Sequence, residues 1–250
     1  MQRAYYQATI HDFRDAADSQ VLGELAGHHG HALEERQRNA WVEQIRHLKD
    51  VLEGSGDGDL FFEFSIPRMG RRADVVLLLQ GVVIVLEYKV GAQGYHAQDV
   101  DQAVDYALDL KNFHAGSHDL PIAPVLVATE APDRSGPINW SDDAIAEPIL
   151  ANRSNLRSTL NRLTQQNRKS IPTQSWLNSS YKPTPTIVEA AKALYSNHTV
   201  EEISRSDSGA INLSKTATAV ANVIESAKVQ KRKVICFITG VPGSGKTLAG

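Results

Sequence analysis

Two short apolar runs separated by two residues stand at the centre of the chain's hydrophobic pattern. Residues 75–79 (VVLLL) and 82–86 (VVIVL) contain no polar position, and Gln80-Gly81 lies between them. Unbroken β-branched runs of this length are typical of strands buried on both faces, and a two-residue connection with glycine is typical of a tight hairpin. The pattern therefore predicts two adjacent antiparallel strands inside a sheet.

The hydrophobic spacing on either side of this hairpin predicts a mixed α/β fold. Apolar strands are expected at residues 60–66, 122–129, 144–151 and 234–239. Helical spacing predicts short helices within the first 30 residues and further helices at residues 33–52, 97–113, 155–163, 186–194 and 213–229. The buried stripes expected on two of these helices are Trp41, Ile45, Leu48 and Leu52 on the first, and Val100, Ala103, Val104 and Ala107 on the second.

Charged residues lie only at the open end of the predicted hairpin. Asp74 enters the first strand, and Glu87 and Lys89 leave the second. Because side chains alternate with period two, Glu87 and Lys89 share a face, and antiparallel pairing brings Asp74 close to Glu87. Two carboxylates can hold Mg²⁺ or Mn²⁺, and the lysine can orient water. The alternative is that all three are polar caps where strands reach solvent.

The spacing D-x12-E-x-K resembles the motif of the PD-(D/E)xK nucleases, which have a restriction-endonuclease-like fold. Asp74 matches the first acid, Glu87 the second and Lys89 the lysine, although Ala73 stands where the motif has proline. The resemblance implies an αβββαβ core with extra N-terminal helices, and metal-dependent hydrolysis of nucleic-acid phosphodiesters, with DNA favoured. Gln102 and Tyr106, expected away from the buried stripe of their helix, resemble the Q-x-x-x-Y of the RecB-like branch and would position the strand.

Glu34 is a third candidate metal ligand. It lies seven residues before Trp41, on the apolar stripe of the helix predicted at 33–52, where an unpaired carboxylate is costly. In the resembled nucleases an acid of the first helix often joins the metal site. The alternative is a glutamate that interacts with the positive end of the helix dipole. The neighbouring His28, His29 and His31 lie beside glycines, and we expect a loop there.

The last residues of the chain contain a complete P-loop motif, G-x-x-x-x-G-K-T, after the apolar run at 234–239. We expect a C-terminal helical segment to lead into this run as the first strand of a P-loop domain. Only three residues follow the motif, too few for the helix that completes a phosphate site, so we expect ATP binding only in a longer form. The predicted ATP-binding residues are Gly240, Gly243, Ser244, Gly245, Lys246 and Thr247.

The order of these motifs resembles the front part of bacterial Schlafen-like nuclease-helicase fusion proteins, some of which are associated with phage defence. The segments WLNSSYKPTPTIVEAAKALY and ITGVPGSGKTLAG also carry this resemblance. It implies a nuclease domain over residues 1–172, a linker and helical segment over 173–233, and the start of a helicase motor at 234–250. The alternative function is a non-cutting nucleic-acid-binding or assembly module that loads or regulates such a motor.

Composition and charge restrict the function classes further. The 250 residues are 42% hydrophobic and 22% charged, as in globular proteins, and the net charge of −3 gives no overall attraction to nucleic acid. Any contact with DNA would depend on local clusters. The candidates are Arg68, Arg71 and Arg72, or alternatively Arg153, Arg157 and Arg162. The lone Cys236 excludes a disulfide framework, and we expect it to fill the core. Without a signal peptide or an apolar spanning segment, we expect a cytoplasmic protein without membrane partners, and leave homo-oligomers open.

Overall fold

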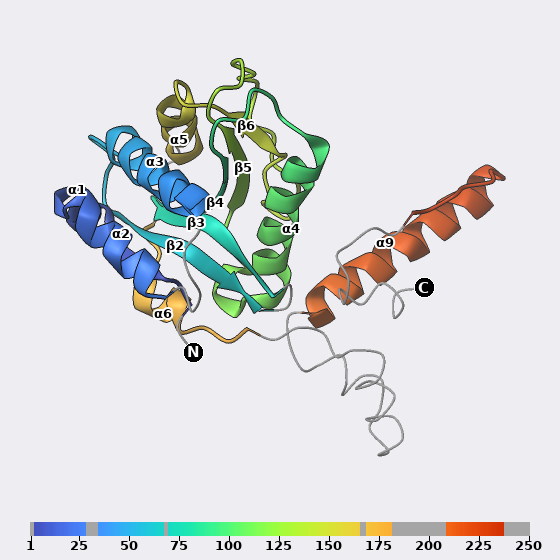
Figure 1. Ribbon diagram of the computed structural model, residues 1–250. Coiled ribbons are helices and arrows are strands. Elements are labelled where there is room, and N and C mark those ends of the chain that lie inside the picture. The colour runs from blue at the N-terminus through green and yellow to red at the C-terminus, as the bar shows by residue number, and fades with distance from the viewer. Residues whose placement is uncertain (1–2, 29–34, 68–69, 166–168, 182–208, 238–250) are drawn as a thin grey trace. The chain divides into compact units, whose positions relative to one another are not determined.

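The structure is a computed structural model that describes residues 3–28, 35–67, 70–165, 169–181 and 209–237 (Figure 1). The chain divides into two compact units. The first contains Met1–Leu108 and Asp119–Asn178, and the second contains Asp109–His118 and Ser179–Gly250. The predicted domain boundaries at residues 172 and 233 stay predictions.

A six-stranded mixed sheet forms the frame of the first unit, with its strands in the order of the chain. The first four strands are antiparallel neighbours, whereas β4, β5 and β6 run parallel. The strands are β1 (Tyr6–Thr9), β2 (Gly58–Ile66), β3 (Arg71–Leu79), β4 (Val82–Lys89), β5 (Ile122–Ala128) and β6 (Ile149–Ala151).

The predicted hairpin is confirmed as β3 and β4, at the centre of the sheet. Leu79 pairs with Val82, so the connection is the two residues Gln80 and Gly81. Both have positive φ, 45° and 81°, which matches the type I′ turn that joins strands of right-handed twist. A glycine therefore suits the second turn position, and Gln80 adopts there a conformation that non-glycine residues rarely take.

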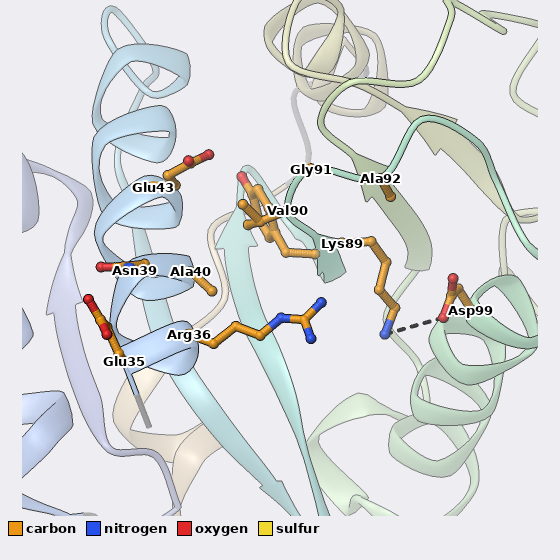
Figure 2. Close-up of a pocket in the computed structure, with 11 residues that line it drawn as sticks. Glu35, Arg36, Asn39, Ala40, Glu43, Lys89, Val90, Gly91, Ala92 and Asp99 are labelled. Atoms are coloured by element: carbon orange, nitrogen blue, oxygen red, sulfur yellow. Dashed lines mark ion pairs between the residues drawn. The ribbon is translucent and has the colours of Figure 1, made fainter. Parts of the chain in front are cut away.

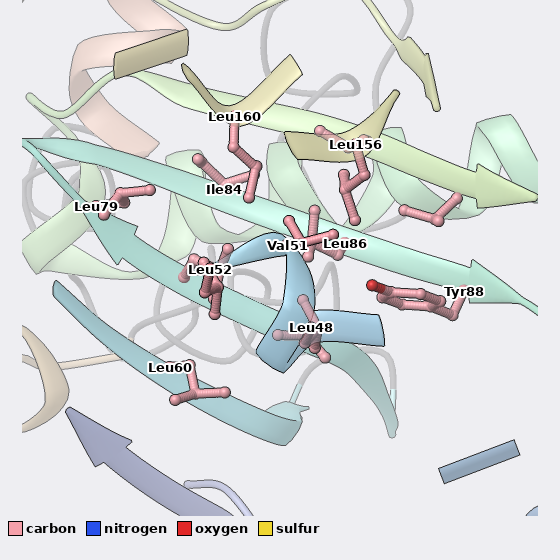
Figure 3. Close-up of a cluster of buried hydrophobic side chains, with 14 of the residues drawn as sticks. Leu48, Val51, Leu52, Leu60, Leu79, Ile84, Leu86, Tyr88, Leu156 and Leu160 are labelled. Atoms are coloured by element: carbon pink, nitrogen blue, oxygen red, sulfur yellow. The ribbon is translucent and has the colours of Figure 1, made fainter. Parts of the chain in front are cut away.

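Several helices pack on one face of this sheet and enclose the main core (Figure 3). The predicted stripe of α3 is buried there, and Leu156 and Leu160 of α5 meet Leu86 and Tyr88 of β4. The helices on this face are α1 (Ile10–Asp15), α2 (Asp18–Gly27), α3 (Glu35–Val51) and α5 (Leu156–Thr164).

The opposite face of the sheet carries a second apolar group and the first part of α4 (Ala97–Phe113). The indole of Trp176, in α6 (Thr173–Leu177), lies 5.6 Å from the ring of Phe61 and 5.3 Å from that of Phe64. Because residues of β4 alternate, Leu86 and Tyr88 join the main core while Glu87 and Lys89 face this second side. The chemistry predicted for β4 is thus separated from the main core by the sheet itself.

Three expectations for the first unit need correction. The strand β1 was not predicted, because four residues are too short for a period-two signal. The strand expected at 144–151 is limited to Ile149–Ala151. Ile145 and Ala146 form only isolated bridges, and Pro148 lacks the backbone N–H that a continuous ladder needs. Tyr106 is 1% exposed and lies within the buried surface of α4, whereas Val100 and Val104 are only half-buried.

The second unit contains the 3-10 helix η2 (Ala115–Ser117) and α9 (Gly209–Gln230), which confirms the helix predicted at 213–229. The apolar run after it was predicted as a strand, but residues 232–237 have no regular structure. No described strand pairs with this run, and Ile235 and Phe237 are 80% and 83% exposed. Cys236 is exposed rather than in the core. The helix predicted at 186–194 lies outside the described residues.

No helix within the described ranges is both long enough and apolar enough to cross a membrane.

Candidate active site

The open end of the β3–β4 hairpin brings the two predicted carboxylates together. Pairing of the strands ends at Val75 and Leu86, so the next residues, Asp74 and Glu87, lie opposite one another. The backbone N–H of Tyr88 donates to Asp74 Oδ2 at 2.7 Å and fixes that carboxylate against β4. Burial raises the pKa of Asp74 well above its usual range, and the charge of Glu87 raises it further.

Glu87 is the most enclosed acid of the site, with 2% of its surface exposed. Its Oε1 accepts from Lys89 Nζ at 3.0 Å, whereas Oε2 is buried and has no hydrogen-bond partner among the described residues. Burial raises the pKa of Glu87, although the ammonium of Lys89 opposes this effect. The carboxylate of Asp74 is half-buried beside the buried carboxylate of Glu87, and one oxygen of Glu87 is unsatisfied. When both groups are ionised, a divalent cation would compensate their charge.

Lys89 is held by three acceptors. Besides Glu87, its ammonium lies 3.3 Å from Asp99 Oδ1 and donates to Gln102 Oε1 at 3.3 Å. Burial alone would lower the pKa of Lys89, but the carboxylates of Glu87, Asp74 and Asp99 together raise it above the usual value. Lys89 is therefore a cation at neutral pH. It can donate hydrogen bonds to water or to a phosphate oxygen, but it is not poised to accept a proton.

One face of α4 supplies the remaining polar groups. Gln102 Nε2 donates to the hydroxyl of Tyr106 at 2.9 Å, which orients the amide so that its oxygen faces Lys89. Burial raises the pKa of Tyr106, so its hydroxyl stays protonated. Asp99 was not among the site residues predicted from the sequence. It lies three residues before Gln102 and seven before Tyr106, so helical spacing alone places it on their face.

A further acid near the site, Glu63 of β2, was also not predicted from the sequence. Its φ of 52° lies in the left-handed region, and this turns its carboxylate to accept from Trp41 Nε1 of α3 at 2.9 Å. The charge of Glu63 contributes to the raised pKa values of both Asp74 and Glu87. No pattern in the sequence marks this conformation, because glutamate in a strand normally has negative φ.

A cleft of about 890 Å³ opens beside these groups (Figure 2). One wall is the first half of α3, and the other is formed by the end of β4 with the first turn of α4. Lys89 and Asp99 line it, whereas Glu87 does not line it but is paired with Lys89. Because β4 and β5 are parallel, their carboxyl ends meet at this edge, where Thr129 Oγ1 accepts from the N–H of Gly91 at 2.8 Å. Such edges commonly bind ligands.

The predicted contacts to nucleic acid are only partly described. Arg71 is exposed at the start of β3. Arg72 is half-buried, with its guanidinium carbon 4.0 Å from the centre of the Tyr5 ring and Nη1 donating to the carbonyl of Glu63 at 2.6 Å. Outside the described residues lie Arg68, Glu34, and the predicted ATP-binding residues Gly240, Gly243, Ser244, Gly245, Lys246 and Thr247.

The described part of the chain contains no group of three or more His, Cys, Asp or Glu residues arranged to hold a metal ion. At the hairpin end, the candidate protein ligands for a cation are the two carboxylates of Asp74 and Glu87. Two carboxylates suit Mg²⁺, which usually keeps several waters and takes its remaining oxygens from phosphate. Comparisons of the chain with protein-family models, curated proteins and solved structures give no significant match.

Proposed function

We propose that this chain is a metal-dependent nuclease that hydrolyses nucleic-acid phosphodiesters, with DNA as the favoured substrate. The observation that carries this proposal is the unsatisfied Oε2 of Glu87, buried next to Asp74 and two residues before Lys89. A strand end used only as a polar cap would expose its charges to water. Here the charges are largely enclosed, which costs stability unless a ligand compensates them.

The order of elements supports the same proposal. The sequence α3, β2, β3, β4, α4, β5 is the αβββαβ order of the restriction-endonuclease-like fold that the motif resembles. A mixed α/β arrangement by itself is shared by many functions. The proposal therefore depends on the site. There Lys89 contacts Glu87 and Gln102, Gln102 contacts Tyr106, and Asp74 lies opposite Glu87.

Asp74 and Glu87 would hold Mg²⁺ or Mn²⁺. When bound, such a cation stabilises negative charge on a phosphate and lowers the pKa of water. Lys89 would donate a hydrogen bond to the attacking water or to a non-bridging phosphate oxygen, and its charge stabilises the anion that develops. Gln102 and Tyr106 would keep the amine of Lys89 directed at the water or phosphate oxygen, while Asp99 would keep that amine protonated.

Incubation of the protein with plasmid, linear duplex, single-stranded DNA and RNA tests this function. We expect products with Mg²⁺ or Mn²⁺ and none with a chelator. Glu87→Gln should abolish cleavage, whereas Glu24→Gln is a matched control at an exposed position of α2 and should leave it unchanged. A wild-type protein that binds nucleic acid but never cuts it would favour the non-cutting binding module instead.

A further inference from the structure

One side of α3 forms a polar wall of the cleft beside the candidate site. It is lined by Arg36 and by the residues three, four and seven positions after it, which are Asn39, Ala40 and Glu43. This spacing places them on one helical face. Opposite them lies Lys89, so any ligand that follows this wall also passes the proposed catalytic amine (Figure 2).

Arg36 extends from α3 into this cleft, and its guanidinium points toward the wall that carries Lys89 (Figure 2). Its side chain is exposed and makes no ion pair or hydrogen bond with any described residue. Two other arginines show the contrast: Arg153 binds Glu43 and Glu130 at 3.0 and 3.1 Å, and Arg46 lies 3.5 Å from Asp18.

The acids of the cleft are already paired or turned away from Arg36. Arg153 holds Glu43, and Lys89 lies 3.3 Å from Asp99. Glu35 precedes Arg36, but in Figure 2 its carboxylate points away from Lys89. Arg36 is thus a cation that lines the cleft without a described counter-charge.

We propose that Arg36 binds a phosphate of the nucleic-acid strand, one that neighbours the phosphate at Lys89. This inference rests on the proposed function and adds the path of the substrate along α3. A guanidinium can donate two parallel hydrogen bonds to a phosphate, which fixes the orientation of the strand as well as its position. The small side chain of Ala40 leaves room for the backbone of that strand, and the amide of Asn39 is a second donor on the same wall.

Binding in the absence of cleavage tests this proposal. End-labelled single-stranded and duplex DNA are titrated with protein in a chelator, and the dissociation constant is measured by fluorescence anisotropy at several salt concentrations. We expect Arg36→Ala to weaken binding about three- to tenfold, the range for losing a charged hydrogen bond. Loss of one phosphate contact should also reduce the slope of log K against log salt by about 0.7 to 0.9.

Arg38→Ala is the matched control. Arg38 lies two residues further along α3, is also exposed, and does not line the cleft, so the same change of charge is made outside the proposed path. It should retain the wild-type dissociation constant and salt slope. Arg36→Lys should recover the salt slope but only part of the affinity, because an ammonium lacks the planar pair of donors.

Equal losses for Arg36→Ala and Arg38→Ala would overturn the proposal, since only overall charge would then matter. Unchanged binding by Arg36→Ala in a correctly folded protein would overturn it as well. The proposed hydrolysis can fail separately: selective loss of binding in Arg36→Ala, together with a wild-type protein that does not cut, would support the strand path and reject the nuclease.

Discussion

The two ends of the β3–β4 hairpin follow opposite physical rules. At the turn, Leu79 and Val82 are 2% and 1% exposed, and every side chain from Leu77 to Val83 apart from the turn residue Gln80 lacks a polar atom. At the open end of the same two strands, Asp74 is half-buried beside Glu87, which is 2% exposed, and Glu87 Oε2 has no partner among the described residues.

From this difference we infer that the open end of the hairpin lowers the stability of the fold. The turn end is what folding alone favours, since apolar burial stabilises it and no polar group is left unpaired. At the open end, two like charges lie close together and are poorly hydrated. This arrangement lowers stability, so it would not be retained for folding alone. We infer that the open end is maintained for binding and chemistry, and that substitutions at the two ends must have opposite effects on activity and stability.

The largest expected effect is the loss of activity in Lys89→Ala. Without its ammonium, the site loses the donor that would orient water and stabilise the developing anion, so we expect cleavage to fall by about a thousandfold, or about 4 kcal/mol in the barrier. Initial rates with Mg²⁺ on a linear duplex measure this. Circular dichroism must show a folded protein, and unchanged rates in that folded variant would reject the assignment of the site.

Leu77→Ala, near the other end of the hairpin, should show the reverse behaviour. Leu77 is fully buried in the main core, so removing its side chain leaves a cavity and should lower the free energy of unfolding by about 2 to 5 kcal/mol. Urea titration measures this loss. Cleavage per folded molecule should stay within about twofold of wild type, because Leu77 touches none of the polar groups; a loss as large as that of Lys89→Ala would contradict the separation of the two ends.

Asp74→Asn should stabilise the protein in a chelator while it abolishes activity. Since the pKa of Asp74 is raised well above 3.8 on folding, the unfolded chain releases this proton at lower pH than the folded one. The free energy of unfolding of wild type therefore falls as pH rises through that interval. Asparagine removes this fall and can still accept from the N–H of Tyr88. We expect a rise in melting temperature of a few degrees at neutral pH.

The melting temperatures of wild type and Asp74→Asn, measured with a divalent cation, give a second test of the difference between the two ends. A ligand that binds only the folded state raises its stability, so Mg²⁺ or Mn²⁺ should raise the melting temperature of wild type but not of Asp74→Asn. If Asp74→Asn were less stable than wild type in the chelator, the buried acids would not be a source of instability, and the contrast between the two ends would fail.

The smallest expected effect is at the turn itself. Gln80 adopts a positive φ of 45°, and asparagine takes this conformation more readily while it forms the favoured Asn-Gly pair. Gln80→Asn should raise the free energy of unfolding by about 0.5 kcal/mol, without altering cleavage. Guanidinium titrations of both proteins would detect this change, and a decrease in stability would mean that the Gln80 side chain makes contacts that matter more than its backbone.

The hairpin and its charged end could be predicted because their signals are local. Period two places Glu87 beside Lys89 and on the opposite face from Leu86, and antiparallel pairing adds Asp74. Asp99 was within reach of the same reasoning, since helical spacing puts it on the face of Gln102. Local patterns of this kind also gave α3 and its buried stripe.

The remaining features depend on contacts between distant parts of the chain. The positive φ of Glu63 goes with a bond to Trp41, which is 22 residues away, and the pairing of β1 with β2 joins Tyr6 to Phe62. The apolar composition of residues 234–237 predicts a strand, yet a strand also needs a neighbour, and no described segment pairs with it. Composition shows what a segment can form, whereas its partners determine what it does form.

One continuous stretch of chain supplies Asp74, Glu87, Lys89, Gln102 and Tyr106, whereas Glu63 and the elements that enclose the site lie outside it. Glu43 and Arg153, which meet at the cleft, are 110 positions apart. During synthesis the acids therefore leave the ribosome before β5 and α5 exist to cover the sheet. We expect these carboxyl groups to stay hydrated, with pKa values in their usual range, until those later elements pack. The ability to bind a cation at this site would then be one of the last properties that the domain acquires during synthesis, and we expect a chain that lacks these later elements to bind a cation weakly.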